Sequence, residues 1–360
     1  MNKNKEVLLS FFIQLFYVLN IVAILYVQNA TLAAIQAATV LICFFFFHKK
    51  IEKKFLGFIV GMIISAAIST LVINNKGINV MLMTLLYGGL AYVLLNTRLS
   101  IKFFKYAFII IALFLVLNML TGSVMNNSLL INKRNSISAV LMIQLFLLYI
   151  AYVQHNANWP IWPVIVSTVI VFWTTNRSGA IAFIFILLSM LALKMKGKIS
   201  LKRICYMIFL FLVIVFIFKL FYSIAFEPMI MRFSTRGIDS ELREIVLQSY
   251  INNAKTNIKY MFFGVDIYHS GIFYILNYNL HNSFLRLHSN YGLIGVCLFL
   301  CFVISALFSY IRSKQYIYII ILTSIFIRLF TDTMAFYGPF DPFIIFLICQ
   351  NAGRKKLFYD

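Results

Sequence analysis

Charged side chains are scarce in this chain of 360 residues. They make up 11% of the sequence, whereas hydrophobic residues make up 62%; a soluble domain carries about 25% charged and about 45–50% apolar residues. No soluble fold buries that much apolar surface. The composition therefore excludes a separate soluble domain and predicts an all-α polytopic membrane protein, with residues 1–360 forming a single integral membrane domain.

Cysteine is rare as well. The five cysteines all lie inside or at the edge of apolar runs, and they show neither metal-like nor paired spacing: Cys43, Cys205, Cys297, Cys301 and Cys349. A buried cysteine behaves as a small hydrophobic residue. We therefore expect neither a disulfide framework nor a metal site.

The apolar runs are long enough to cross a bilayer many times. A hydrocarbon core about 30 Å thick needs roughly 20 apolar residues per helix. The first run follows MNKNKE without a small-residue cleavage site, so we expect a retained helix and not a removed signal peptide. About twelve spans are predicted, near residues 7–27, 30–47, 55–73, 78–96, 103–121, 137–154, 159–175, 178–195, 204–226, 290–310, 316–330 and 340–352.

Acidic residues are few, 10 against 31 lysines and arginines, and most of the basic residues gather in short loops. With the N-terminus in the cytoplasm, the clusters at 48–54, 98–105, 194–203 and 353–356 all fall on the cytoplasmic side, which follows the positive-inside rule. We expect both termini in the cytoplasm and the long segment 227–280 outside. Because the positive charges lie in loops and form no single face, no nucleic-acid partner is expected.

The large loop at 227–280 has the pattern of an amphipathic helix at about 240–258. Asp239 or Ser240 is a suitable N-cap for that helix. Apolar residues then recur at helical spacing: Leu242, Ile245, Val246, Tyr250, Ile251, Ala254 and Ile258. Such a helix would lie across the mouth of the helical bundle.

An isolated arginine, Arg177, stands in the junction WTTNRSGAI at 173–181 between two apolar runs. One interpretation is a topological turn whose arginine reaches the membrane surface. The other is an anion site, in which the guanidinium lies beside a helix N-terminus with free N–H groups from Ser178 and Gly179.

Three more arginines, Arg232, Arg236 and Arg243, occur within MRFSTRGIDSELREI of the large loop. They form a basic patch against the outer membrane surface. Taken alone, the patch is best explained as a solvated surface or a surface that binds lipid headgroups.

The segment LHNSFLRLHSNYGLIG at 280–295 carries the most informative pattern. If it is helical, one stripe holds His281, Leu285, His288, Gly292 and Gly295. The two glycines would let a neighbouring helix approach closely. A histidine at a membrane edge is often a structural hydrogen-bonding group, but it is also the side chain best suited to remove a proton from a hydroxyl near neutral pH.

The segment RLFTDTMAFYGPFDPFI at 328–344 holds Arg328 and Asp332 at i, i+4, so we expect them to pair, and Arg328 lies close enough to a helix end to snorkel. Asp341 before Pro342 predicts an N-cap with proline in the first turn of the last helix. Asp332 and Asp341 are also possible contacts for a sugar or an arginine.

The spacing around His281 matches a family pattern. His281 and Asn282, then nine residues, then Gly292-Leu-Ile-Gly295 fit H-[NSQ]-x9-G-x-x-G. On this motif the chain resembles the superfamily of O-antigen polymerases (Wzy) and O-antigen ligases. Those bacterial membrane proteins handle glycans carried on undecaprenyl diphosphate.

Other landmarks of that superfamily occur in the same order along the chain. Arg177 stands at an outward turn, arginines begin the large loop, and Arg243 lies in its helix, so the resemblance covers roughly residues 130–350. Ser283 stands where the ligases often carry a glutamate. That difference favours a polymerase.

The resemblance implies a GT-C-type glycosyltransferase that uses no metal and no other cofactor. Arg177 and Arg243 match the diphosphate-binding arginines, and His281 matches the essential histidine. Arg232 and Arg236 match the pattern only loosely. These two arginines are kept as secondary candidates together with Asn282, His288 and Asp332.

The function implied is polymerisation of O-antigen, capsule or exopolysaccharide repeat units at the outer face of the bacterial inner membrane. The expected partners are undecaprenyl-diphosphate-linked repeat units, membrane lipids and a chain-length regulator. The alternatives are a ligase, which would deliver the glycan to lipid A core or another surface acceptor, and a lipid-linked oligosaccharide flippase. A flippase predicts charged central cavities and internal repeats, and neither pattern is present in the sequence.

Overall fold

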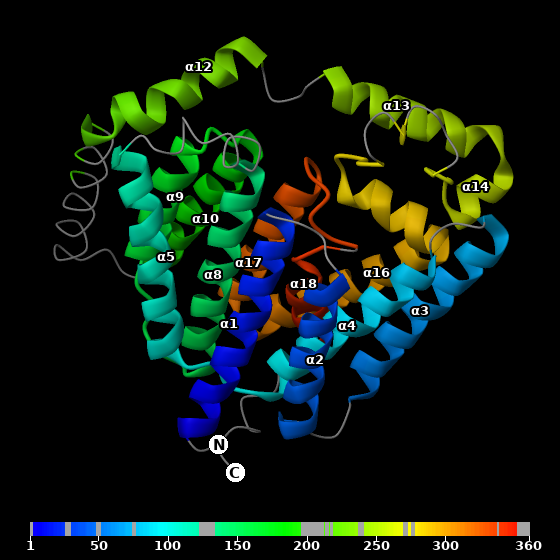
Figure 1. The fold of residues 1–360 in the computed structure, drawn as a ribbon, viewed down its shortest axis with the longest axis horizontal. Coiled ribbons are helices and arrows are strands. Elements are labelled where there is room, and N and C mark those ends of the chain that lie inside the picture. Colours follow the sequence, from blue (N-terminus) through cyan, green and yellow to red (C-terminus); the bar gives the residue numbers. More distant parts are fainter. Residues whose placement is uncertain are drawn as a thin grey trace. The chain divides into compact units, whose positions relative to one another are not determined.

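The computed structural model describes residues 3–25, 30–47, 52–73, 77–121, 134–195, 212, 216, 219–236, 241–268, 273–274, 278–336 and 338–350. Every regular element in these ranges is helical (Figure 1), so the predicted all-α class is confirmed. The helices are α1 (Lys3–Leu25), α2 (Ala30–Phe47), α3 (Lys53–Ile73), α4 (Gly77–Asn96), α5 (Ile101–Thr121), α8 (Arg134–Gln154), α9 (Trp162–Trp173), α10 (Arg177–Met195), the π-helix η1 (Tyr222–Phe226), α12 (Glu227–Arg236), α13 (Glu241–Thr256), α14 (Ile258–Phe263), α16 (Ser283–Ser313), α17 (Tyr316–Leu329) and α18 (Asp341–Cys349).

Within the described residues, six helices are long and apolar enough to cross a membrane: α3, α4, α5, α8 from Ser136, α10 and α16. The chain is thus a multi-pass membrane protein, and each of these helices covers a predicted span. Three other predicted spans, 159–175, 316–330 and 340–352, form the shorter helices α9, α17 and α18, of 12, 14 and 9 residues. A helix of 12 residues rises only about 18 Å, which is less than the bilayer core. Most of the predicted span 204–226 lies outside the described residues.

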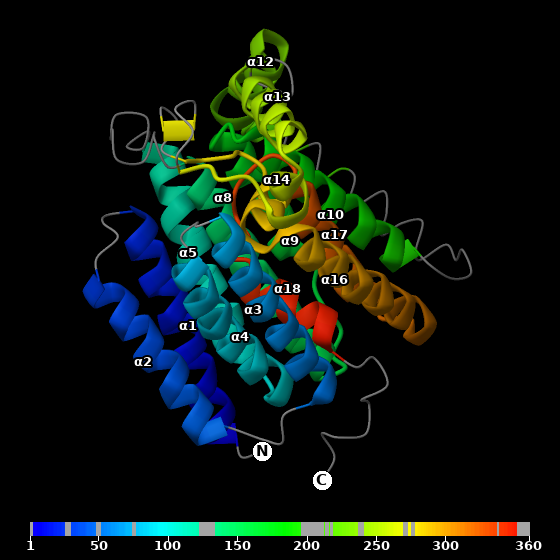
Figure 2. The same cartoon turned by 90° about the vertical axis from the view of Figure 1, so that its right-hand side faces the viewer.

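The chain divides into two compact units. Unit 1 comprises Met1–Asn20, Gln28–Arg98 and Asp239–Asp360, and unit 2 comprises Ile21–Val27 and Leu99–Ile238. In unit 2, α5 packs against α8 and α9, and α10 packs against α9. In unit 1, α3 packs against α4 and α16, and α18 packs against α4 (Figure 2).

The short helix α18 forms the centre of unit 1. All nine of its residues are buried, as expected for a helix that is apolar on every side. Polar side chains join the surrounding helices: the Thr84 and Tyr291 hydroxyls lie 2.7 Å apart, and the Tyr310 hydroxyl donates to the Leu347 carbonyl. Unit 1 is therefore held together by apolar packing and by a few buried hydrogen bonds.

Two glycines bring α14 and α16 into backbone contact. Gly292 has φ +63° inside α16 and breaks its helical geometry; a Cβ there would lie 2.7 Å from the Phe262 carbonyl oxygen. Gly264 has φ +98°, and a Cβ there would lie 2.5 Å from the His288 carbonyl oxygen. The predicted close approach of a neighbouring helix at Gly292 is thus confirmed. A Cβ on Gly295 would lie 3.5 Å from the Ser65 Cβ of α3.

The predicted continuous stripe from His281 to Gly295 is wrong. His281 precedes α16, because Asn282 is the N-cap of that helix. Farther along, Gly292 interrupts the helical geometry. A glycine free to adopt positive φ allowed the kink that the sequence pattern treated as regular helix.

The predicted amphipathic helix in the large loop exists as α13 but is shorter than expected. Asn257 adopts an extended conformation and accepts a hydrogen bond from the Lys259 N–H at 2.9 Å, which starts α14. Of the predicted apolar set, Val246 and Tyr250 are buried in a core with Val265, Ile267, Phe273 and Leu280, whereas Ile245 is 48% exposed. The proposed caps Asp239 and Ser240 lie outside the described residues.

Substitution of either contact glycine should destabilise the protein. We expect Gly264→Ala and Gly292→Ala each to lower the free energy of unfolding by roughly 1–3 kcal/mol or more, because the new Cβ meets backbone atoms at a positive φ. The measurement is thermal unfolding of the detergent-purified protein. Gly57→Ala in α3 is the matched control, since nothing lies within 4 Å of its Cβ position. Equal melting temperatures for all three variants would contradict the contact.

Candidate functional site

His281 lies directly before α16 in a left-handed backbone conformation, with φ +50°. Its N–H donates to Asn279 Oδ1 at 3.0 Å, and the Thr333 hydroxyl donates to the same oxygen at 2.6 Å. A positive φ on a residue other than glycine is uncommon and persists where neighbouring bonds hold it. Asn279 therefore fixes His281 and ties it to the turn that follows α17.

Asn282 caps α16 and also bonds to the end of α17. Its Oδ1 accepts from the N–H groups of Phe284 at 2.8 Å and Leu285 at 3.2 Å. Its Nδ2 donates to the Phe330 carbonyl at 3.1 Å. The side chain proposed as a secondary site residue thus has a structural partner at each end.

Ser283 is fully buried and makes three hydrogen bonds to the same turn. Its hydroxyl donates to the Asp332 carbonyl at 2.7 Å and accepts from the N–H groups of Met334 at 3.0 Å and Ala335 at 3.2 Å. In the sequence, Ser283 stood out only because it departs from the ligase pattern. Its partners lie 49 to 52 positions away, so no local pattern indicated the role.

The predicted ion pair between Arg328 and Asp332 is confirmed, with Nη2 and Oδ2 3.4 Å apart. The proposal that Arg328 snorkels is wrong, because its side chain is 0% exposed. A guanidinium buried in this way needs an opposite charge beside it. Asp332, which also accepts the Thr333 N–H at 3.0 Å, supplies that charge.

Two charges from other elements reach the His281 imidazole. Burial lowers its pKa below the ordinary histidine value, the Asp332 carboxylate acts to raise it, and the Arg243 guanidinium acts to lower it. The charge on Arg243 also reaches Arg328. Arg243, His281, Arg328 and Asp332 are thus linked electrostatically in unit 1, and we call these four residues the His281 cluster. A neutral imidazole can accept a proton, and a guanidinium can bind an anion.

His288 connects α16 to the large loop. Its Nε2 lies 2.8 Å from the Met261 carbonyl, and its Nδ1 lies 2.8 Å from the Tyr250 hydroxyl. Because a carbonyl only accepts, Nε2 carries the proton and the tyrosine donates to Nδ1. Burial raises the pKa of Tyr250, which keeps it a donor. Both ring nitrogens of this secondary candidate are therefore engaged in holding α13 and α14.

Arg177 is the first residue of α10, in unit 2, and is half-buried. The expectation of a free N–H at Gly179 is wrong, because the Asn176 Oδ1 accepts that N–H at 3.1 Å and the Ser178 hydroxyl at 3.0 Å. Asn176 Nδ2 in turn donates to Ser138 Oγ at 2.6 Å. The asparagine thus caps α10 in the way an anion would.

Of three further candidates, two have side chains that the structure does not describe, and one stands differently from expectation. Arg232 and Arg236 fall in α12 of unit 2, and their side chains lie outside the described part of the structure. Asp341 is not an N-cap: Phe340 holds the cap position, while the Asp341 carboxylate accepts from the N–H groups of Phe336 at 2.6 Å and Gly338 at 2.9 Å. Its oxygens bind the preceding turn and not the first turn of α18. The proline predicted for the first turn is present.

The described residues contain no group of three His, Cys, Asp or Glu side chains arranged to hold a metal ion. A cavity of about 20 Å³ lies in unit 1, bounded by Thr84, Tyr291 and Asp341 together with apolar side chains. That volume accommodates a water molecule. It is too small for a sugar ring.

Comparison with protein families, curated proteins and solved structures finds no match to this chain.

The pH at which His281 titrates should respond to its two charged neighbours. Diethyl pyrocarbonate reacts with neutral imidazole, so the pH dependence of His281 modification, followed by mass spectrometry, reports its pKa. We expect a midpoint below the ordinary histidine value, lowered further by Asp332→Asn and raised by Arg243→Gln. Lys255→Gln removes an exposed positive charge from the same helix as Arg243 and is the control. Midpoints that shift in the opposite directions would contradict the cluster.

Proposed function

We propose that this protein is a membrane polysaccharide polymerase. It transfers a growing glycan from undecaprenyl diphosphate onto a lipid-linked repeat unit, in the synthesis of O-antigen, capsule or exopolysaccharide. The observation that carries the proposal is the His281 cluster. Arg243 and His281, which the family resemblance pairs as diphosphate ligand and essential histidine, lie 38 positions apart in the sequence but interact electrostatically in unit 1.

The reaction forms one bond and breaks another. An acceptor hydroxyl attacks the anomeric carbon of the donor glycan, the bond from that carbon to the diphosphate oxygen breaks, and the hydroxyl proton leaves with a base. His281 is the proposed base or orienting group for the hydroxyl, a role for which burial favours the neutral imidazole. Undecaprenyl diphosphate leaves with the bonding electrons.

The leaving diphosphate needs positive charge as its own negative charge grows. Arg243 from the large loop and Arg177 are the proposed ligands, since a guanidinium binds phosphate oxygens in a bidentate manner. In this proposal Arg328 does not bind the diphosphate, because Asp332 already neutralises it. Asp332 instead offsets part of the positive charge of the cluster. Its carboxylate acts to raise the pKa of His281, which keeps the imidazole from becoming too weak a base.

The arrangement in the membrane is part of the same proposal. Twelve spans in a GT-C-type architecture, with both termini in the cytoplasm of a bacterial inner membrane, would put the large loop at the outer face. The alternation of basic loops supports that orientation. In unit 1, α13 and α14 lie at the end opposite the start of α1 (Figure 1). A chain-length regulator remains a proposed partner.

The decisive experiment is to incubate the purified protein with lipid-diphosphate repeat unit alone and to separate the products by size. A ladder of products supports a polymerase. No reaction until a lipid A core or another acceptor is added would support the ligase instead. We expect His281→Ala to reduce the ladder by about 10²–10⁴-fold, the range for loss of a general base. His155→Ala, a histidine of unit 2, is the control, and a normal ladder from His281→Ala would refute the assignment.

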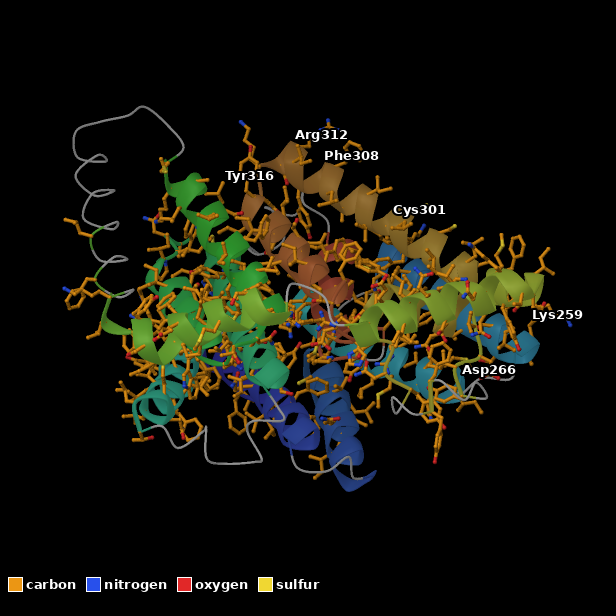
Figure 3. The ribbon with its side chains drawn as sticks, turned by 90° about the horizontal axis from the view of Figure 1, so that it is seen from above. Lys259, Asp266, Cys301, Phe308, Arg312 and Tyr316 are labelled. Atoms are coloured by element: carbon orange, nitrogen blue, oxygen red, sulfur yellow. The ribbon has the colours of Figure 1, made fainter. Side chains whose placement is uncertain are left out.

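Replacement of the proposed diphosphate ligands by lysine tests the need for a planar, bidentate cation. We expect Arg177→Lys and Arg243→Lys each to lower the rate of polymerisation at least about tenfold, because lysine keeps the charge but loses the fork. The control is Arg312→Lys, at an exposed position in the last turn of α16 (Figure 3). Near-normal rates in both test variants would leave only a topological role for these arginines.

A further inference from the structure

The short helix α14 has an exposed apolar stripe that the proposed reaction does not use. Ile258 is 71% exposed, Met261 50% and Phe262 42%. Their spacing of i, i+3 and i+4 puts all three on one side of the helix. Lys259 is exposed next to this stripe and points outward (Figure 3). A helix of this kind in an extramembrane loop would ordinarily turn such a stripe toward the protein.

The backbone at the end of α14 is satisfied by side chains. The carbonyls of Met261, Phe263 and Val265 accept hydrogen bonds from His288 Nε2, the Ser69 hydroxyl and the Ser289 hydroxyl respectively. The last carbonyls of a helix have no partner within the helix, and in solution water commonly supplies one. In an apolar medium, side chains must do so.

The beginning of α14 is closed in the same way. The Asn257 side chain accepts the Lys259 N–H. At the other end of the helix, the Gly264 N–H donates to the Tyr260 carbonyl at 3.0 Å. Gly264 lies so close to the backbone of His288 and Ser289 that a Cβ would not fit between them. The element is therefore rigidly attached to a helix long enough to cross the membrane.

The stripe lies beside the end of a helix that is long and apolar enough to cross a membrane. In unit 1, α14 packs beside the last turns of α3, one of the six helices able to cross a membrane (Figure 1). Ser69 of that helix bonds the Phe263 carbonyl about one turn before α3 ends. Since α3 ends at Ile73, this contact puts α14 at the level where a span leaves the bilayer.

We propose that α14 is an interfacial membrane anchor whose stripe of Ile258, Met261 and Phe262 enters the lipid at the boundary of the acyl chains. Lys259, and Lys255 in the last turn of α13, meet the phosphates of anionic lipids at its edge. The occupant of the stripe is the bilayer. Because α13 is joined to α14 and packs against it, the anchor sets the depth of Arg243 relative to the membrane surface.

The test uses spin labels on the full-length protein with its five cysteines replaced, reconstituted in vesicles of phosphatidylethanolamine and phosphatidylglycerol. Phe262→Cys carries the label in one sample and Asn252→Cys, at an exposed position of α13, carries it in the other. Oxygen concentrates in the bilayer, and a nickel chelate stays in water. We expect the label at position 262 to collide more with oxygen than with the nickel chelate, and the label at 252 to show the reverse.

Two outcomes would overturn the anchor. One is a label at position 262 that is as open to the nickel chelate as the label at 252, which would mean that the stripe faces water. The other is protection from both reagents, which would mean that protein covers it.

A second measurement avoids the cysteine replacements. Phe262→Trp in the otherwise native chain should gain fluorescence over the parent protein, and lipids brominated near the top of the acyl chain should quench that gain. The same lipids should leave the gain from Asn252→Trp unquenched. Equal quenching of the two variants would overturn the anchor. Neither measurement depends on polymerase activity.

Discussion

The interior of a bilayer offers no water, so every backbone group left open where a helix ends or breaks must find a partner within the protein. In unit 1, side chains from other elements supply such partners at the end of α14 and in the turn after α17. His288 and two serines bind the carbonyls of α14, while Ser283 and Asp341 bind the amides of the turn. These bonds hold the loop residues whose charges and side chains make up the candidate site.

The His281 cluster combines the positive charges of Arg243 and Arg328 with the negative charge of Asp332. Arg328 is tolerated without exposure because Asp332 lies one helical turn away. Asp332 also opposes the combined effect of burial and Arg243 on His281. One carboxylate thus serves a buried cation and a candidate base. The turn that carries it is attached to both sides of His281, through Asn279 before it and through Asn282 and Ser283 after it.

Predictions from the sequence succeeded where the physical cause is local and failed where a side chain had a choice of partners. The helix α13, the pair of Arg328 with Asp332 and the close helix contact at Gly292 follow from helical spacing and from the absence of a side chain. Asp341 before Pro342 indicated an N-cap by a local rule of the same kind, but its carboxylate accepts hydrogen bonds from amides of the preceding turn. Gly179 lies in the first turn of α10, as expected, but its N–H already donates to the Asn176 side chain.

The sequence by itself determined that this protein is helical and lies in a membrane, because composition and apolar run length leave no other place for so much hydrophobic surface. It also determined which short segments combine arginine, histidine and glycine. Only the tertiary structure decided that Arg328 is buried, that His288 is a structural link, and that Asn279 and Ser283 hold the turn after α17. Those bonds join residues 27 to 54 positions apart, and contacts at such separations leave no periodic trace in the chain.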